Sequence, residues 1–508
     1  MTDQKTPLPD SAEQLELDAA AEVTQLAPDA PEHSRRNTIV IALLLVSTFV
    51  VFLNETVMNV ALPPIMEDLG VEPSVGQWLT TAFLLTMAVV IPTTGFLLQR
   101  LNTRTVYLAA MVLFSTGTLI AALAPTFGVL VAGRVVQASG TAIMMPLLMT
   151  TVLTLVPPRD RGRIMGRVSI VMSVAPAIGP SVSGLILNAF EWRFIFWLVL
   201  PLAIGAVVLG ALRMQNVTVP RAVPLDVLSV ILSAFAFGGL IYGLSSLGES
   251  VRGTVMVQPW IPLVVGGVAM VAFVLRQLVR QRTDSALLDL RVFTSRDYTI
   301  SVALLCVSML ALFGTIILLP IYVQNVLKLE PIVIGLLLLP GGLLMGLLGP
   351  IVGRLVDRFG PKVLVVPGTI IISAVFWSMT MLNENSSFWW VLVAHMSLSL
   401  GLALLFTPLF AAGLGALKPH LYSHGSAIVT TLQQVAGAAG TALFIALMVL
   451  QSTALEAQGV AEVPALAGGI HLAFMFGGGL SMAAIVLAFF VRKPPVDEAA
   501  SPGDRGGH

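Results

Sequence analysis

Two side chains that carry a formal charge stand inside apolar runs of this sequence. Glu55 lies in FVVFLNETVMNVALPP, and Arg134 lies in LVAGRVVQASGTAIMMP. A charge at the middle of a bilayer costs about 2.5 to 3.5 kcal/mol even on lenient insertion scales, so a charge kept there indicates a functional site by default. A buried carboxylate beside a cation can bind and release a proton. Glu55 and Arg134 are therefore the first candidate functional residues.

The composition indicates which elements hold these charges. The chain has 508 residues, of which 56% are hydrophobic and 11% are charged, and its mean hydropathy is +0.92. An ordinary soluble domain is about 25% charged. Here apolar runs of about 20 residues recur, each long enough to cross the hydrocarbon core as a helix. The sequence predicts an all-α polytopic membrane protein, and its single cysteine, Cys306, excludes a disulfide framework and a CxxC metal or redox pair.

Fourteen segments are long and apolar enough to span the membrane. Their predicted bounds are 38–62, 77–98, 105–125, 127–156, 165–189, 194–212, 226–247, 259–278, 298–320, 332–352, 361–382, 388–412, 425–450 and 468–491. An even number places both termini on one side. Of the 27 lysines and arginines, 23 fall in the tails and loops of that side, and only Arg193, Arg252 and Lys328 fall in the opposite loops. The positive-inside rule then predicts that both termini are cytoplasmic.

The same pass along the chain predicts its domains. The first 37 residues carry eight acids and almost no aromatic residues, so we expect 1–37 to be a disordered cytoplasmic tail without a cleavable signal peptide. A six-helix bundle (38–212), two inserted helices with linkers (213–297), a second six-helix bundle (298–491) and a short cytoplasmic tail (492–508) follow. The basic residues are scattered among short loops, which argues against nucleic-acid binding.

An internal repeat supports two related bundles. GFLLQRLNTR from Gly95 aligns with GRLVDRFGPK from Gly353 at an offset of 258 residues, and VLVAGRVVQASGTAIMMPL from Val129 aligns with VLVAHMSLSLGLALLFTPL from Val391 at an offset of 262. An offset of that size corresponds to eight spans, so the second bundle repeats the first in the same orientation. Parallel repeats with substrate handled at their interface are typical of rocking transporters.

The order of these motifs resembles the fourteen-helix drug:proton antiporter branch of the major facilitator superfamily. LNETVMNVALP, from Leu53, resembles the span-1 motif of its lincomycin-resistance-type members, and the resemblance covers about residues 38 to 491. The acid of that motif usually falls where this chain has Asn54, whereas here it is displaced by one residue to Glu55. Asn59 lies four residues after Glu55 and shares its helical face. The alternative is that Glu55 reaches the outer interface from the end of the span.

The span-4 motif of the superfamily carries an arginine and a glutamine that are linked to proton coupling. Arg134, Gln137 and Thr141 stand at i, i+3 and i+7, which gives one polar face to an otherwise apolar helix. Gly133 and Gly140 permit close approach of a neighbouring helix. A purely structural arginine is the alternative.

The predicted topology brings the two charges to one depth. Glu55 is seven residues before the predicted outer end of span 1, and Arg134 is seven residues after the predicted outer start of span 4. At 1.5 Å per residue, both lie roughly 10 Å below the outer surface. We expect Glu55 to be the proton carrier, loaded and released as its separation from Arg134 changes between inward-facing and outward-facing states.

Two further motifs resemble parts of the transport machinery. SVAPAIGPSVSGLI in span 5 resembles the antiporter motif, and we expect its prolines to bend the helix and its glycines to pack tightly, plausibly against the other half. Its candidate residues are Pro176, Gly179, Pro180 and Gly184, with a plain kinked core helix as the alternative. GRLVDRFGPK resembles the cytoplasmic loop motif, in which we expect Gly353 and Gly360 in a tight turn and Asp357, Arg358 and Lys362 in charge pairs that hold a cytoplasmic gate. In the first copy Gln99 replaces the acid and Asn102 replaces the glycine, which argues against a latch there.

Candidate substrate contacts are less specific. They are Asn54, Met144, Met145, Tyr322, Gln324, Asn325 and His395. Methionines can form an adaptable apolar wall, Tyr322 has an interface anchor as its alternative role, and His395 is the polar residue of the second half nearest in depth to Arg134. His420 and His424 are four residues apart but lack a nearby carboxylate, so we expect no metal site.

The leading function is proton-driven export of lipophilic drugs or antibiotics by a protein that is not an enzyme. No GxxxxGK[ST] sequence occurs, which disfavours ATP as the driver. Export of a lipid or glycolipid by the same fold is the alternative, and an intramembrane enzyme is a third class that lacks a paired catalytic set. We expect a small lipophilic substrate, protons and the lipid bilayer as partners, no cofactor, and a monomer.

Overall fold

The computed structural model describes residues 31–218, 220, 224–250 and 257–492, and no β-strand occurs among them. Fourteen of the described helices are long and apolar enough to cross a membrane. This result confirms the predicted fold class and the predicted number of spans. Most of the predicted tails and part of the linkers lie outside the described residues, but residues 31–37, which the sequence predicts to be disordered, belong to the first helix.

The helices follow the predicted order of two bundles with an inserted pair between them. The first bundle contains α2 (Pro31–Leu69), the one-turn α3 (Pro73–Gly76), α4 (Trp78–Arg100), α5 (Thr103–Ala122), α6 (Phe127–Leu155), α7 (Arg161–Ala189) and α8 (Arg193–Arg213). The inserted pair is α9 (Val227–Ser250) and α10 (Trp260–Arg280), followed by the short turns η2 (Gln281–Thr283) and η3 (Leu290–Thr294). The second bundle contains α11 (Arg296–Ile321), the π-helical turn η4 (Tyr322–Val326), α12 (Pro331–Phe359), α13 (Lys362–Met379), α14 (Phe388–Gly415), α15 (Tyr422–Ala457) and α16 (Glu462–Ala488).

Three predicted spans end seven residues too early, because α2, α12 and α15 continue to Leu69, Phe359 and Ala457. The sequence predicts that span 1 ends near residue 62, but α2 continues through Pro63 and Pro64 to Leu69. The residues after the prolines are good helix formers. Tertiary contacts also hold the end of the helix, because Nε1 of Trp192 and a guanidinium N–H of Arg193 donate to Oδ2 of Asp68 at 2.9 Å and 2.8 Å.

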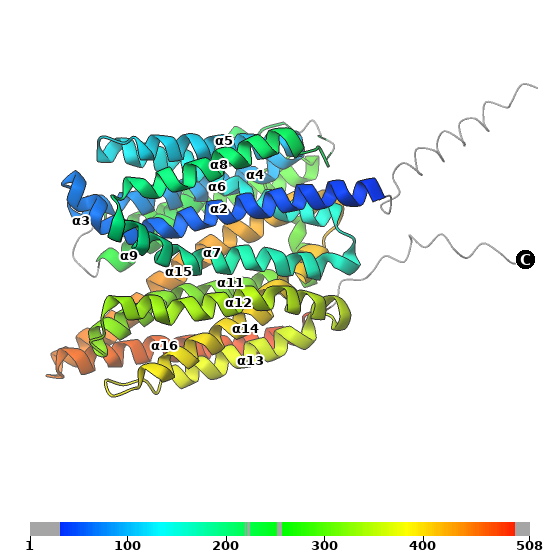
Figure 1. Cartoon of the computed structure of the whole chain (residues 1–508). Coiled ribbons are helices and arrows are strands. Elements are labelled where there is room, and N and C mark those ends of the chain that lie inside the picture. The colour runs from blue at the N-terminus through cyan, green and yellow to red at the C-terminus, as the bar shows by residue number, and fades with distance from the viewer. Residues whose placement is uncertain (1–30, 219, 221–223, 251–256, 493–508) are drawn as a thin grey trace, which may run out of the picture.

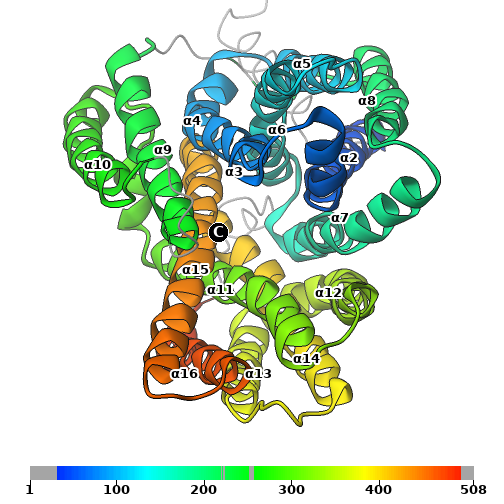
Figure 2. The same ribbon diagram turned by 90° about the vertical axis from the view of Figure 1, so that its left-hand side faces the viewer.

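The two bundles lie side by side with parallel repeats (Figures 1 and 2). Within the chain order, α4 and α7 are the second and fifth spans of the first bundle, and α12 and α15 are the corresponding spans of the second. Helix α7 packs along α12, and α4 packs along α15. The interface between the bundles therefore consists of two equivalent seams, α7/α12 and α4/α15. The start of α2 and the end of α16 lie at one end of the molecule, which is the predicted cytoplasmic face (Figure 1).

Helices α5 and α6 approach each other closely because glycines line their contact. A Cβ on Gly117 would collide with the backbone of Gln137 and Gly133, and a Cβ on Gly140 would collide with the backbone of Ala110 and Phe114. The predicted close approach at Gly133 and Gly140 is confirmed. This contact fixes the height and rotation of α6, the helix that carries Arg134.

We predict that Gly117→Val destabilises the protein by about 1 to 3 kcal/mol, because the added atoms meet backbone that cannot move aside. Thermal unfolding in detergent measures this loss. Gly205→Val is the matched control, because a Cβ at Gly205 in α8 meets nothing within 4 Å. Equal unfolding midpoints for the two variants would contradict the prediction.

Candidate functional site

Arg134 is buried in the first bundle, where it contacts Gln137 of its own helix and Phe83 of α4. Its side chain is 2% exposed, and Nη1 donates to Oε1 of Gln137 at 2.5 Å. Nε2 of Gln137 then donates to Oγ1 of Thr118 on α5 at 2.8 Å. The guanidinium also lies 4.0 Å from the ring centroid of Phe83 on α4, a favourable contact between a cation and a π face. The polar face predicted for α6 thus forms one connected network.

Glu55 lies close to this network without joining it. Helix α2 packs against α6, and Glu55 and Arg134 interact electrostatically. Among the described residues no ion pair joins the two. Oε2 of Glu55 is buried and has no hydrogen-bond partner, and Nε of Arg134 is also unpartnered. The carboxyl group and the guanidinium are therefore neighbours that keep unused bonding capacity.

Asn54, the residue before Glu55, has an unpartnered side chain in the interior. Asn54 is fully buried, and neither atom of its side-chain amide has a hydrogen-bond partner. A buried amide without a partner is costly, so it is a natural position for a ligand or water to bind. Asn59 continues α2 one turn after Glu55, but its side chain lies outside the described part of the structure.

The other predicted substrate residues are scattered. Met144 and Met145 of α6 are buried in the main hydrophobic core. His395 of α14 is buried with Nδ1 unpartnered, and it hydrogen-bonds the backbone of Leu338. Its ring packs beside Gly341 of α12. His395 therefore contacts another helix of its own bundle.

Tyr322, Gln324 and Asn325 form the π-helical turn η4 beyond α11. Tyr322 is fully buried, and its hydroxyl donates to the carbonyl oxygen of Asn383 at 2.6 Å. This contact ties η4 to the loop after α13. The side chains of Gln324 and Asn325 are exposed at the end of the molecule opposite the predicted cytoplasmic face, away from Glu55 and Arg134.

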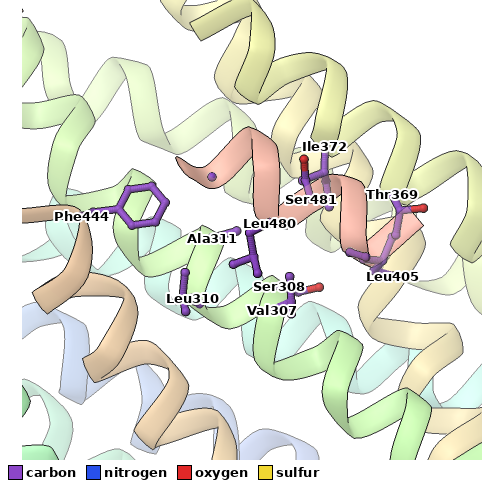
Figure 3. Close-up of a pocket in the computed structure, with 12 residues that line it drawn as sticks. Val307, Ser308, Leu310, Ala311, Thr369, Ile372, Leu405, Phe444, Leu480 and Ser481 are labelled. Atoms are coloured by element: carbon purple, nitrogen blue, oxygen red, sulfur yellow. The ribbon is translucent and has the colours of Figure 1, made fainter. Parts of the chain in front are cut away.

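A small apolar pocket lies elsewhere, within the second bundle (Figure 3). Its lining comes from α11, α13, α14, α15 and α16 and includes Ser308, Thr369, Leu405, Phe444 and Ser481. None of the predicted substrate residues lines it. The pocket is a packing gap between helices of one bundle and does not communicate with Arg134.

The antiporter motif packs differently from the prediction. A Cβ on Gly179 would collide with Thr56 of α2, in the same bundle, while one on Gly184 would meet nothing within 4 Å. The expected tight packing occurs at Gly179 and not at Gly184, and its partner is α2 of the same bundle, not the other half. Pro176 and Pro180 lie inside a helix that is continuous over Arg161–Ala189. The motif therefore sets α7 against α2 next to Glu55.

The close contact between the bundles uses other residues of α7. A Cβ on Gly162 or Gly166 would meet the backbone of Gly353 or Gly349 in α12. Further along the seam, Gly342 and Gly346 of α12 face Ala177 and Val174 of α7. Gly353 is thus a helix-interior contact, and the predicted turn at Gly353 is wrong. The predicted turn is confirmed at Gly360, which ends α12 with a φ of +82°.

Asp357 closes the predicted cytoplasmic end of this seam. Oδ1 and Oδ2 accept the backbone N–H groups of Gly162 and Arg163, each at 2.8 Å. These are N–H groups of the first turn of α7, which a carboxylate stabilises through both hydrogen bonds and the helix dipole. Of the other two predicted gate residues, Arg358 lies over the ring of Phe359 and Lys362 lies over the ring of Phe489. Their charge pairing stays a prediction.

The second seam carries a latch that the sequence does not predict. Nε2 of Gln99, at the end of α4, donates to Oγ of Ser423 at 3.2 Å and lies 2.5 Å from Nε2 of His424. Gln99 replaces the acid of the loop motif in the first repeat. That position is the one feature of the sequence that could have indicated this latch. The side-chain amide of Gln99 donates a hydrogen bond across the seam. A latch therefore forms here without the acid.

Two other hydrogen bonds join the bundles near the same end. Oγ of Ser169 and Oγ1 of Thr407 lie 2.5 Å apart, and a guanidinium N–H of Arg161 donates to the hydroxyl of Tyr422 at 3.0 Å. Within the described part of the chain, the side-chain hydrogen bonds between the two bundles thus lie toward the predicted cytoplasmic face. The structure is closed at that face.

The sequence profile of the Major Facilitator Superfamily matches residues 44–441. The chain belongs to the major facilitator superfamily. Its members are transporters, so the site serves transport and not catalysis. The chain is 41% identical to the lincomycin resistance protein LmrB of Listeria monocytogenes, over 89% of this chain and 96% of that protein. It is 31% identical to a multidrug resistance protein B homolog of Mycobacterium tuberculosis, over 81% of this chain and 76% of that protein.

Solved structures show the same fold. The human organic anion transporter MFSD10 matches with a TM-score of 0.62 at 15% identity, covering 89% of this chain and 99% of that one. The proton:xylose symporter XylE matches with a TM-score of 0.62 at 14% identity, covering 91% and 97%. At these identities the likeness concerns the arrangement of the helices alone.

We predict that Asp357→Ala opens the α7/α12 seam at its closed end. Loss of a helix cap costs about 1 kcal/mol, so the seam should open about fivefold more often. The rate at which a membrane-impermeant maleimide labels Ser173→Cys, an isosteric change of a buried seam residue, measures this opening in a Cys306→Ser background. Asp160→Ala is the control, because the ion pair of Asp160 within the described part of the chain is with exposed Arg159 at 3.5 Å. Equal labelling rates would contradict the role of Asp357.

Proposed function

We propose that this protein is a proton-coupled exporter of lipophilic drugs or antibiotics. It works by alternating access in a bacterial cytoplasmic membrane, with both termini in the cytoplasm. Three observations support the proposal: the membership of the major facilitator superfamily, the drug-resistance names of the bacterial relatives, and a buried carboxyl group beside a buried arginine. The third observation carries the proposal, because it supplies the coupling chemistry.

Glu55 is the proton carrier in this proposal. Oε2 has no hydrogen-bond partner and is shielded from solvent, so a proton bound there neutralises a charge that the surroundings do not otherwise neutralise. When the proton leaves, the negative charge is stabilised by Arg134, with which Glu55 interacts electrostatically. Arg134 is held in place by Gln137 at 2.5 Å and by the ring of Phe83. It can therefore serve as a fixed cation while Glu55 moves.

Movement of α2 relative to α6 is the step that couples the proton to transport. Thr56, next to Glu55, packs against Gly179 of α7, and its hydroxyl lies 3.4 Å from the carbonyl oxygen of Ala175. Because α7 also forms the seam with α12, rocking of the two bundles moves α7 and displaces the turn of α2 that carries Glu55. In this proposal the substrate binds at Asn54, in the same turn of α2 as Glu55. Substrate and proton therefore act on the same segment of α2.

The driving force is sufficient for export. One proton that crosses a potential of 100 mV releases about 2.3 kcal/mol, and about 1.4 kcal/mol corresponds to a tenfold concentration ratio. A single proton moving inward per substrate therefore sustains a steep outward gradient of a neutral compound.

We predict that Glu55→Gln abolishes uptake driven by a pH gradient in proteoliposomes that contain the protein inside out. Counterflow exchange of the same substrate should persist, because glutamine resembles a permanently protonated carboxyl group and still permits the rocking motion. A suitable substrate is a lincosamide antibiotic, chosen from the names of the relatives.

The matched control is Glu67→Gln, which makes the same substitution on an exposed position of the same helix. This variant should keep both activities. Gradient-driven transport that survives in Glu55→Gln would exclude Glu55 as the carrier, whereas loss of both activities would indicate a structural role.

We predict that Asn54→Ala raises the apparent KM for substrate about fivefold, the value expected for loss of one hydrogen bond. The number of protons exchanged per substrate should stay the same, because Glu55 is intact. Initial rates of transport and of proton release, measured in the same vesicles, give both quantities. An unchanged KM would remove Asn54 from the substrate site.

A further inference from the structure

The inserted helices α9 and α10 lie against only one of the two seams. Helix α9 packs against both α4 of the first bundle and α15 of the second (Figure 2). On α4 the ring of Trp78 stacks on Tyr242 of α9 at 6.1 Å between centroids. The opposite seam, α7/α12, has no such cover among the described helices. The inserted pair is therefore placed to act on the α4/α15 seam, where Gln99 and His424 meet.

A buried polar cluster ties α9 to α10 near the predicted cytoplasmic face. Asp226, just before α9, accepts two hydrogen bonds from Arg276 at 2.8 Å and 2.7 Å and one from Arg280 at 3.1 Å. The hydroxyl of Ser229 donates to Oδ2 of Asp226 at 2.7 Å. Burial raises the pKa of Asp226, but the hydrogen bonds and charges of its partners outweigh burial and hold that pKa well below its ordinary value. The cluster thus stays charged and paired at physiological pH.

Gln277 links this cluster to the loop that follows α10. It is fully buried, and its Nε2 donates to Oγ of Ser229 at 2.8 Å. Its Oε1 accepts the backbone N–H groups of Leu287 and Leu288 at 2.8 Å and 3.3 Å. One side chain therefore fixes the loop to the inserted pair at two successive amides.

Arg291 makes the rest of the loop compact. Asp289 accepts the backbone N–H of Arg291 at 2.9 Å and its guanidinium N–H groups at 2.6 to 3.0 Å, and Arg291 also pairs with Asp284. Burial raises the pKa of Asp289, but the bonds from Arg291 lower it below its ordinary value overall. The segment from Asp284 to Arg291 is thus a cross-linked unit held at one end by Gln277.

His424 of α15 connects the 284–291 segment to Gln99 of the first bundle. Its side chain is buried, and Nδ1 lies 3.3 Å from the backbone nitrogen of Asp289 and close enough to Leu287 for a backbone hydrogen bond. Nε2 lies 2.5 Å from the side-chain amide of Gln99 on α4. A neutral imidazole has one donor and one acceptor nitrogen, and the amide nitrogen of Gln99 can only donate. The bond to Gln99 therefore needs Nε2 as the acceptor, with Nδ1–H as the donor to the backbone carbonyl of Leu287. The described contacts run from Asp226 to Gln99 without a break.

We propose that the inserted pair α9–α10 is the element that positions His424 for its bond to Gln99 and so holds the α4/α15 seam closed. Gln277 and Ser229 are positioning residues in this arrangement, since they touch neither substrate nor Gln99. The inference rests on the proposed function only in treating the closed end as one state of an alternating-access cycle. It assigns a role to the two helices that the six-plus-six repeat does not require.

Spin-label distances across the closed end test this proposal. Labels at the exposed positions Arg213 in the first bundle and Lys418 in the second, in a Cys306→Ser background, report the fraction of molecules open at this end. We expect Gln277→Met to raise the open fraction about fivefold, as for loss of one hydrogen bond. Ser229→Ala is a smaller change in the same chain of contacts, and it should also raise the open fraction. It replaces Gln277→Met in the experiment if that variant does not fold.

Two comparisons separate positioning from general destabilisation. Gln281→Met makes the same substitution one turn later, where Oε1 has no hydrogen-bond partner, and it should leave the distances unchanged. Gln99→Met should open the seam by itself, and adding Gln277→Met to it should add nothing, because both changes remove the same bond.

Additive effects of Gln99→Met and Gln277→Met, an equal shift in Gln281→Met, or no shift in Gln277→Met and Ser229→Ala would each overturn the proposal. The measurement needs neither substrate nor a pH gradient. Its outcome is therefore independent of whether Glu55 carries the proton.

Discussion

The burial of two opposite charges in a low-dielectric interior is the constraint on which the rest of the structure depends. A guanidinium in such surroundings needs hydrogen bonds and a polarisable neighbour. Gln137 and Phe83 supply these to Arg134, and Thr118 of α5 holds Gln137 in place. Glu55 has the charge of Arg134 nearby but no bond to it. The first bundle must therefore be rigid around Arg134, which explains the backbone-to-backbone packing of α5 and α6, while the turn of α2 around Glu55 can change its surroundings at small cost.

The closed end of the molecule follows a related rule. The bundles are joined there by hydrogen bonds to backbone amides and side-chain amides, with glycines that allow α7 and α12 to touch. Each such bond contributes about 1 kcal/mol. Breaking a few of them at the closed end therefore costs little free energy, which new bonds at the opposite end of the molecule can offset. The α4/α15 seam has an additional support in α9 and α10, and the α7/α12 seam does not. The two equivalent seams are thus unequal in their surroundings, which gives the transport cycle a built-in asymmetry.

Much of the architecture could be predicted from the sequence, because the length of an apolar run and the placement of arginines report directly on spans. The polar face of α6 could also be predicted, since Arg134 and Gln137 stand three residues apart on one helix. Contacts between residues on different helices could not be predicted. The role of Gly179 depends on Thr56 of α2, and that of Asp357 depends on two amides of α7, neither of which a local pattern encodes. The bond between Gln99 and His424 could not be predicted for the same reason, and the end of α2 is misplaced in the prediction because Pro63 and Pro64 usually indicate a stop.

Infrared difference spectroscopy of the reconstituted protein tests the central claim most directly, because the carbonyl stretch of a protonated carboxylic acid reports the state of Glu55 itself. The account predicts a band that appears as the pH is lowered, disappears when substrate is added, shifts on isotope labelling of glutamate, and is absent in Glu55→Gln but present in Glu67→Gln. A spectrum with no band that depends on Glu55 at any pH, or a band that substrate leaves unchanged, would contradict it.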